Sequence, residues 1–482
     1  MLYHPQCVEE IWDTWLYYES GVHYLFTLHK SSGAIWDGIS LSTSKDGVHF
    51  QEVGVIIEKR ADAEWLGTGS TLKVGGRYYL NFSESREGMQ GIYFAESDDL
   101  IHWRVMDGNE CHPDPRWYDV TPAGRWDCIW TVPLEEGGYV GYLTAVPLTD
   151  EPGRTGASIG KVISEDGIHW RAAPPPLFEW GDMPSIELFE VGAVEFFDGY
   201  YHMMMGLGEE RLGNRQLWRG LNGQFGMYHF ISDSPHGPFR PVEDRFRLLC
   251  SPGAMTYFSR FYPYPDGMLV CHHSCEQVND QPQIFLSPLK RAFTDGQVME
   301  LGWWEGNEAM FGAPQFLDMA AAECAYSARG VSASAEGNAI QMTQNVGGMV
   351  LSFPQKFNPS VGAMLTFQCC VEPAPGRMGA MGVWLGHGGK RTAFLMETRG
   401  RTVIGDLEGG NFKGRNEIER GLRAGTRHTV RFLMRFSLTE LYIDERLVQC
   451  YSLSDRLDGT MGFALESAHI EVSDVCLAPM IC

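Results

Sequence analysis

Three acidic side chains in the first half of the chain hold a shared position relative to a recurring strand that opens with glycine. Asp13, Asp127 and Glu190 lie eight, eleven and nine residues before the opening glycines of three such strands. If each acid stands on the innermost strand of its own structural unit, the three carboxylates converge, and mutual repulsion and lost hydration make them costly to keep. Hydrolysis of a glycosidic bond uses such a group, because one carboxylate attacks the sugar or activates water, a second protonates the leaving oxygen, and a third can bind ring hydroxyls. The spacing therefore predicts a carboxylate site suited to sugar hydrolysis.

The same acids have a structural alternative, since a strand can begin with an Asp or Glu that accepts a hydrogen bond from a neighbouring backbone amide. Agreement of all three in phase favours the catalytic interpretation. Glu187, three residues before Glu190, is an alternative acid, but on a strand it would point to the opposite face. Tryptophans surround the acids, and a sugar ring packs against aromatic faces, although core packing is the other role open to each ring. The candidate substrate-binding aromatics are Trp12, Trp36 and Trp126.

An internal repeat predicts the elements that position these residues. A run of acid, turn and aromatic recurs as SKDGVHF (44–50), SDDLIHW (97–103) and SEDGIHW (164–170), with a degraded copy SDSPHGPF (232–239). Strands that open with glycine begin at residues 21, 76, 138, 199 and 267, so the units are 55 to 68 residues long. Their aromatic and β-branched residues alternate with period two, as strands require. About four β-runs per unit are the content of one propeller blade.

The repeat thus predicts a five-bladed β-propeller over residues 1–305. Superposing the units places Gly67 and Phe258 at the positions that the three acids occupy in the other blades. Histidines that recur in the repeat, His49, His102 and His169, are predicted to be structural hydrogen bonders. The alternative fold is a β-sandwich in which the turn motifs recur by coincidence.

The pattern changes at about residue 300. Residues 306–329 lose the repeat and are predicted to be a linker. Alternating strands without the blade signature resume over residues 330–482, separated by turn segments such as LEGGNFKG. Strands with this spacing predict an antiparallel, jelly-roll-like β-sandwich. The whole chain is therefore expected to be all-β.

Composition narrows the classes of partner. The 482 residues (54.1 kDa) suit two or three domains, and 38 Lys and Arg against 61 Asp and Glu give a net charge of −23. This excess of negative charge argues against a nucleic acid or an anionic membrane as the main partner. No apolar stretch is long enough to span a bilayer, and the first residues lack a basic segment followed by an apolar run. Twelve cysteines without a CxxC pair argue against a disulfide framework or a zinc site. We expect a cytoplasmic protein without a metal or other cofactor.

Four segments resemble motifs of the five-bladed furanosidase superfamily, notably glycoside hydrolase family 32, the β-fructofuranosidases, levanases and inulinases. IWDTWLYYESGVHYLFT stands where that family has Asn-Asp-Pro-Asn-Gly, and LGTGSTLKVGGRYYL is similar to its Phe-Ser-Gly-Ser segment. GRWDCIW is similar to Arg-Asp-Pro, and EVGAVEFFDGYY has the spacing of the segment that carries the family's Glu. The chain departs from the family where Trp126 stands between Arg125 and Asp127, where Val and Gly replace Cys-Pro after Glu190, and where Asn, Pro and Gly are missing around Asp13.

The resemblance implies a retaining glycoside hydrolase that cleaves terminal furanosides, fructosides first, in small molecules or oligosaccharides. Asp13 would be the nucleophile, Asp127 the transition-state stabiliser and Glu190 the acid/base, with Ser70 and Arg125 among the substrate contacts. Family 43, the inverting arabinofuranosidases and xylosidases, places Asp, Asp and Glu in the same three blades and remains an alternative. A carbohydrate-binding propeller that has lost catalysis is a further alternative. A propeller used only as a protein scaffold is disfavoured, since it has no need of acids at its axis.

Overall fold

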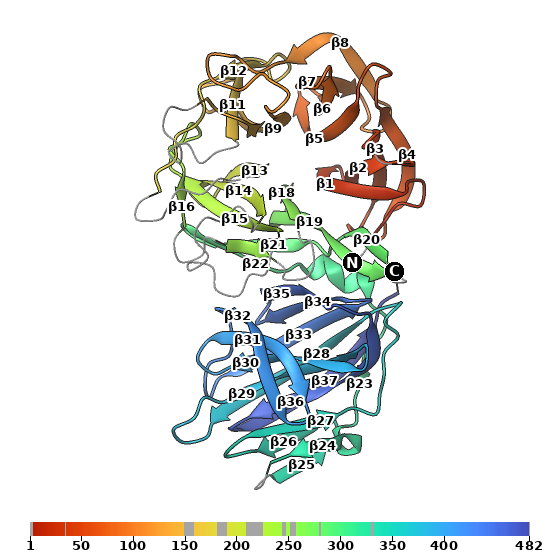
Figure 1. The fold of residues 1–482 in the computed structure, drawn as a ribbon, viewed down its shortest axis with the longest axis vertical. Coiled ribbons are helices and arrows are strands. Elements are labelled where there is room, and N and C mark those ends of the chain that lie inside the picture. The colour runs from red at the N-terminus through yellow and green to blue at the C-terminus, as the bar shows by residue number, and fades with distance from the viewer. Residues whose placement is uncertain are drawn as a thin grey trace.

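The computed structural model describes residues 3–33, 35–148, 159–180, 190–208, 225–242, 247–250, 257–278, 281–328 and 332–481. Its described residues form β-strands and two short 3-10 helices, η4 (Glu305–Met310) and η5 (Met319–Ala321). Figure 1 shows two parts along the long axis, a ring of small sheets coloured red to green and a β-sandwich coloured teal to blue. Within the described ranges, no helix is long and apolar enough to cross a membrane. The prediction of an all-β chain with a propeller followed by a sandwich is confirmed.

The first part of the ring consists of three sheets whose strands pair in chain order. The first sheet contains β1 (Glu10–Glu19), β2 (Val22–Lys30), β3 (Gly38–Ser44) and β4 (Gln51–Glu58). The second contains β5 (Trp65–Val74), β6 (Arg77–Arg86), β7 (Met89–Ser97) and β8 (Arg104–Cys111). The third contains β9 (Trp126–Pro133), β10 (Tyr139–Ala145), β11 (Ile159–Ser164) and β12 (Arg171–Ala173). Each sheet therefore corresponds to one unit of the repeat.

Two further groups of strands close the ring. One contains β13 (Glu190–Phe197), β14 (Tyr200–Gly208), β15 (Phe225–Ser232), β16 (Arg240–Pro241) and β17 (Arg247–Cys250). The other contains β18 (Tyr257–Tyr264), β19 (Gly267–Val278), β20 (Gln281–Leu286), β21 (Lys290–Asp295) and β22 (Val298–Trp303). This last group is continuous with one sheet of the sandwich, because β22 pairs with β35 through Gly302 and Arg446. In Figure 1, β1, β5, β9, β13 and β18 face the middle of the ring.

The repeated acid motif closes the turn before the outer strand of a blade. In its second copy, Asp99 accepts hydrogen bonds from the backbone of Ile101 and His102, and its other oxygen lies 2.7 Å from His102 Nδ1. The backbone and side chain of His102 hold the pKa of Asp99 below its ordinary range. The same 2.7 Å contact joins His49 to Asp46 and His169 to Asp166. The prediction that these histidines are structural hydrogen bonders is confirmed.

The sandwich packs two sheets around one large apolar core that includes Leu365, Phe367, Phe394, Phe432 and Phe463. One sheet has the order β24-β27-β36-β29-β30-β31-β32, and the other runs from β22 through β35-β34-β33-β28-β37-β26-β25, with β23 also on β37. The strands are β23 (Gln315–Phe316), β24 (Glu323–Ser327), β25 (Ser332–Glu336), β26 (Ala339–Thr343), β27 (Gly348–Ser352), β28 (Ala363–Pro373), β29 (Ala380–His387), β30 (Lys390–Glu397), β31 (Arg401–Glu408), β32 (Asn411–Ile418), β33 (Arg427–Arg435), β34 (Leu438–Ile443), β35 (Arg446–Ser452), β36 (Leu457–Glu466) and β37 (Ala468–Pro479).

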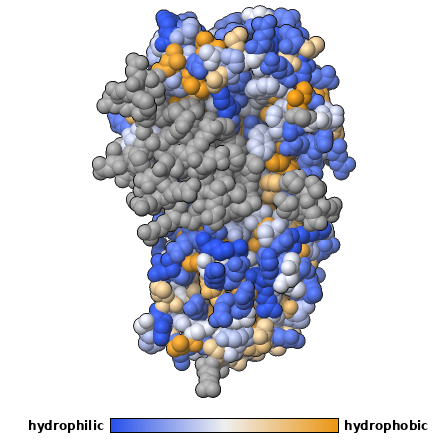
Figure 2. Space-filling model, in the orientation of Figure 1, coloured by the Kyte–Doolittle hydropathy of each residue, from blue (hydrophilic) through white to orange (hydrophobic). Residues whose placement is uncertain are grey.

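The boundaries of the two domains stay a prediction. The segment predicted to be a linker, 306–329, contains strands β23 and β24, which pair with β37 and β27 of the sandwich. The face in Figure 2 is largely hydrophilic over its described surface, with apolar side chains scattered across it, as a net charge of −23 leads one to expect.

Candidate active site

The five strands that face the middle of the ring each carry a β-bulge at a matching position. The extra residue lies at Asp13 in β1, at 67–68 in β5, at 128–129 in β9, at Gly192 in β13 and at 258–259 in β18. Asp13, Cys128 and Phe258 have φ of 40°, 54° and 53°, in the left-handed region that costs a non-glycine residue about 1–2 kcal/mol. A bulge bends its strand and re-aims the side chains beside it. Asp13, Asp127 and Glu190 all lie at or within two residues of these bulges.

The three acids line one cavity of about 340 Å³. Asp13, Asp127 and Glu190 are only 6%, 7% and 8% exposed, so each carboxyl has lost most of its contact with bulk water. The volume is at the small end of the range for sites that bind small molecules. The remaining wall is formed by Trp12, Leu28, Ile35, Trp36, Trp65, Leu66, Gly67, Thr68 and Arg125. The structure thus brings together the three predicted catalytic acids with the predicted contacts Trp12, Trp36 and Arg125.

Arg125 joins two of the acids. Its Nη2 donates a hydrogen bond of 3.1 Å to Asp127 Oδ2 and one of 2.6 Å to Glu190 Oε1. The other oxygen of Asp127 accepts a hydrogen bond of 2.5 Å from Ser83 Oγ. Asp127 therefore has a donor on each oxygen, which fixes its orientation at the cavity wall.

Asp13 has a different environment. Burial raises the pKa of Asp13 well above its ordinary value, and the negative charge of Glu190 raises it further, while Arg260 opposes both effects. Its Oδ1 has no hydrogen-bond partner in the part of the chain that the structure describes. Among the charges around Asp13, Arg260 favours the ionised form that a nucleophile or a general base requires, and burial opposes it.

Aromatic side chains form one side of the cavity. The rings of Trp12 and Trp36 are tilted by 32° with centroids 6.0 Å apart, and both side chains are partly exposed. Lys30 Nζ lies 4.1 Å from the ring centroid of Trp36, a cation–π contact that supports the ring. The pair offers an aromatic wall against which a sugar ring can pack.

Two predicted contacts lie elsewhere. Trp126 is 1% exposed, packs on Tyr118 and lines a second cavity that shares Arg125 with the first. It precedes Asp127 on the same strand, and neighbouring side chains of a strand point to opposite faces. For this reason Trp126 does not face the acid cavity. Ser70 is buried outside the wall of the first cavity, and its hydroxyl donates to the carbonyl of Ile129, tying β5 to β9. Glu187, the alternative to Glu190, lies outside the described residues.

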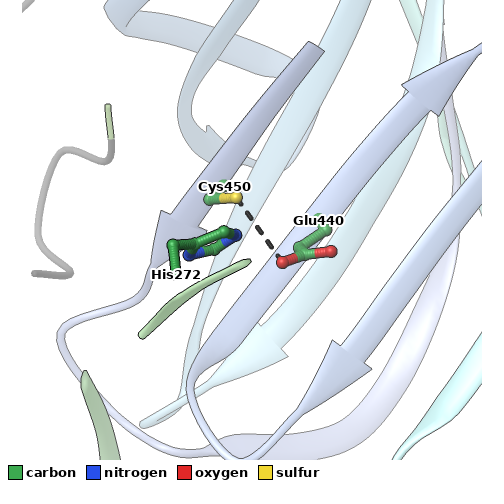
Figure 3. Close-up of side chains that lie close together, drawn as sticks. All are labelled: His272, Glu440 and Cys450. Atoms are coloured by element: carbon green, nitrogen blue, oxygen red, sulfur yellow. Dashed lines mark hydrogen bonds between the residues drawn. The ribbon is translucent and has the colours of Figure 1, made fainter. Parts of the chain in front are cut away.

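One group of metal-type ligands occurs in the described ranges, away from the acid cavity. Nitrogen, oxygen and sulfur atoms of His272, Glu440 and Cys450 lie within 4.8 Å of one another, and the Cys450 thiol donates to Glu440 Oε1 at 3.5 Å (Figure 3). Lys290 Nζ already lies 2.6 Å from the same Glu440 oxygen, and both side chains are fully buried. This ammonium balances the charge that a metal ion would neutralise, so the group fits a buried ion pair better than a metal centre.

Known proteins resemble this chain in structure and not detectably in sequence. No protein-family model matches the sequence, and no curated protein matches it. Among solved structures, a family 32 β-fructofuranosidase from Bombyx mori, determined in complex with sucrose, has a TM-score of 0.65 at 11% identity and covers 98% of this chain and 92% of its own. A sucrose-6-phosphate hydrolase from Lactobacillus gasseri has a TM-score of 0.65 at 14% identity, with 96% and 88% covered. An exo-inulinase from Aspergillus awamori has a TM-score of 0.62 at 11% identity, with 100% and 97% covered. This chain has the fold of the family 32 glycoside hydrolases.

Within this family 32 fold, two features of the acid site escaped the sequence-based prediction. Gly67 stands where a Cβ atom would lie 2.2 Å from Ser83 Oγ and 3.1 Å from Asp127 Oδ1, so glycine is needed for Ser83 to reach Asp127. The superposed repeat placed Gly67 at the right position but did not reveal Ser83. Arg260, two residues after Phe258, is fully buried near Asp13. Its sequence signal is that it is the one charged residue in the strand YFSRFYPY.

Proposed function

We propose that this protein is a glycoside hydrolase that cleaves terminal furanosides, fructosides in preference to arabinosides, in small molecules or oligosaccharides. The observation that carries the proposal is the convergence of Asp13, Asp127 and Glu190, from three separate sheets, on one cavity with an aromatic wall. The fold shared with a β-fructofuranosidase, a sucrose-6-phosphate hydrolase and an exo-inulinase supports the same substrate class.

The mechanism assigns one role to each acid. The ionised carboxylate of Asp13 attacks the anomeric carbon, and Glu190 gives its proton to the leaving oxygen as the glycosidic bond breaks. Glu190 then removes a proton from water, whose oxygen displaces Asp13 and releases the sugar. Asp127, held by Ser83 and Arg125, accepts hydrogen bonds from ring hydroxyls and stabilises positive charge that develops on the ring.

A hydrolysis screen tests the function. Sucrose, inulin and levan are incubated with the protein beside aryl arabinofuranoside and aryl xyloside, and the free sugar is measured. Release of fructose is the expected result, with an Asp13→Asn preparation as the control for contaminating enzymes. Release of pentose alone would assign the protein to the family 43 type of activity. Binding of these sugars without turnover would instead make it a carbohydrate-binding propeller.

The stereochemistry of the product is a separate prediction. Attack by Asp13 through a covalent intermediate involves two inversions, so the first-formed sugar should keep the anomeric configuration of the substrate. NMR spectra taken in the first minutes of hydrolysis, before mutarotation, measure that anomer. An inverted first product would contradict the nucleophile role and make Asp13 the base that activates water.

The aromatic wall predicts a binding effect. Trp36→Ala should raise KM by about 3- to 10-fold, with a smaller change in kcat, because packing of a sugar against the ring contributes about 0.5–1.5 kcal/mol. Trp36→Phe should keep most of the affinity. Trp103, a partly exposed tryptophan whose indole donates to Leu100 O in a blade turn, provides the matched control. Equal changes in KM for Trp36→Ala and Trp103→Ala would contradict the assignment.

A further inference from the structure

Arg260 is a fully buried cation on the strand that separates two of the catalytic strands. It lies on β18, which packs against both β1 and β13, the strands of Asp13 and Glu190. It follows the bulge residue Phe258 by two positions. Unlike Arg125, Arg260 is not among the residues that line the acid cavity, and it is fully buried.

Among the described residues, the close contacts of the Arg260 guanidinium are with a sulfur atom and two aromatic rings. Its Nη2 donates to the Cys128 sulfur at 3.0 Å, and its Cζ lies 4.2 Å from the ring centroid of Phe258 and 5.2 Å from that of Trp130. Its Nε and Nη1 have no hydrogen-bond partner among the described residues. Burying an ion costs several kcal/mol unless an opposite charge compensates it. Negative charge nearby would therefore offset the cost of burying this cation.

Asp13 is the anion that Arg260 acts on. The charged groups that face Asp13 are Glu190 on β13, Asp127 on β9, Arg260 on β18 and Arg125 just before β9. Burial and the two acids favour the neutral form of Asp13, and the two arginines favour the ionised form, with Arg260 the stronger. Arg125 is already engaged by hydrogen bonds to Asp127 and Glu190. The two arginines thus serve different acids.

We propose that Arg260 is a positioning residue that favours the ionised form of the Asp13 carboxylate from a fully buried position beside the acid cavity. Arg125 holds the stabiliser and the proton donor at the cavity wall, and Arg260 favours the charged form of the nucleophile from a fully buried position. The role of Asp13 as nucleophile rests on the proposed function. The electrostatic effect of Arg260 on Asp13 is independent of that function.

The test measures the ionisation of Asp13 directly and needs no substrate. Protein labelled with ¹³C at the aspartate carboxyl is titrated by NMR, and the Asp13 signal is assigned from its loss in Asp13→Asn. Arg260→Met should raise the titration midpoint of Asp13 by about one pH unit or more, since an opposite charge nearby shifts a carboxyl by about 1–3 units. Arg260→Lys keeps a positive charge, although its ammonium reaches less far than the guanidinium, and should raise it by less.

Arg60 provides the matched control, because its guanidinium also stacks on an aromatic ring, 4.1 Å from the centroid of Tyr93, but is not among the charges that face Asp13. Arg60→Met should leave the midpoint unchanged. An unchanged midpoint in Arg260→Met, or in the neutral variant Arg260→Gln if Arg260→Met does not fold, would overturn the proposal, and so would an equal shift in Arg60→Met.

Enzyme kinetics supply a second readout. In Arg260→Met, the acid limb of the profile of kcat/KM against pH should move upward together with the NMR midpoint. A merely structural role would lower kcat/KM by the same factor at every pH and would overturn the proposal. If the protein hydrolyses none of the sugars but the NMR midpoint still moves, the coupling stands and the proposed function fails.

Discussion

Replacement of Asp13 by asparagine is expected to lower turnover by about 10⁴-fold or more while the protein stays folded. The amide cannot form the covalent bond to the anomeric carbon, and it cannot act as a base in an inverting route either. The side chain has nearly the same volume as the carboxyl, so the bulge at Asp13 and its φ of 40° can be kept, because asparagine tolerates this conformation well. Initial rates on the best substrate of the screen measure the loss.

The same substitution should make the protein more stable at neutral pH. The folded-state pKa of Asp13 lies well above its ordinary value of 3.8, chiefly because the carboxyl is buried, so between about pH 4 and the folded-state pKa the native state holds a proton that the unfolded chain releases. Native stability therefore falls as pH rises from about 4 toward the folded-state pKa. Asparagine does not titrate and escapes this penalty. The gain in thermal midpoint of Asp13→Asn over the wild type should grow with pH across this window.

Asp127→Asn is the matched control for stability. Asp127 accepts hydrogen bonds from Ser83 and Arg125, so removal of its charge weakens two charge-assisted hydrogen bonds instead of relieving a penalty. This variant should be less stable than the wild type at neutral pH and should also lose activity. The quantity to compare is the difference in thermal midpoint between Asp13→Asn and the wild type. If this difference were smaller at neutral pH than at acid pH, the environment assigned to Asp13 would be wrong.

The propeller could be predicted from the sequence because the contacts within each copy of the repeat join residues close together in the chain. Each copy of the acid motif closes its own turn through contacts within three residues, as Asp99 and His102 illustrate, so its pattern survives in the sequence. The alternation of period two then separates strands from helices. The join between the ring and the sandwich was not accessible, since the pairing of Gly302 with Arg446 connects residues far apart in the chain and depends on how the two parts dock.

The candidate site was accessible only in part. Superposition of the repeats brought Asp13, Asp127 and Glu190 into phase, and all three line the same cavity. The bulges that orient these acids are shifts in the pairing register between two strands. The sequence of one strand alone does not determine where such a shift occurs. For that reason Trp126, adjacent to Asp127 in sequence, was predicted in the cavity although it points away from it. Arg260 was overlooked because its effect on Asp13 is long-range and passes between strands.

Loss of Lys290 is expected to destabilise the protein by about 3–5 kcal/mol, the usual effect of leaving one partner of a buried ion pair uncompensated. Lys290 on β21 and Glu440 on β34 join the ring to the sandwich at 2.6 Å, with both side chains fully buried. Glu440 also accepts hydrogen bonds from Tyr442 and from the thiol of Cys450. In Lys290→Met these two neutral donors remain, but the carboxylate loses the ammonium 2.6 Å away. The free energy of unfolding from urea titration measures the loss.

The double variant Lys290→Met with Glu440→Met separates the penalty of an unpaired charge from the contribution of the pair itself. It should recover most of the lost stability, because neither charge is then buried alone and methionine fills apolar space well. Lys73 and Glu19 form the matched exposed pair, with a distance of 3.0 Å and side chains 39% and 25% exposed. Lys73→Met should change the free energy of unfolding far less than Lys290→Met does, because solvent screens an exposed pair. If Lys290→Met cost no more than Lys73→Met, the buried charge would have to be compensated by another group, and the junction would owe its stability to the paired strands β22 and β35 and the apolar side chains around them.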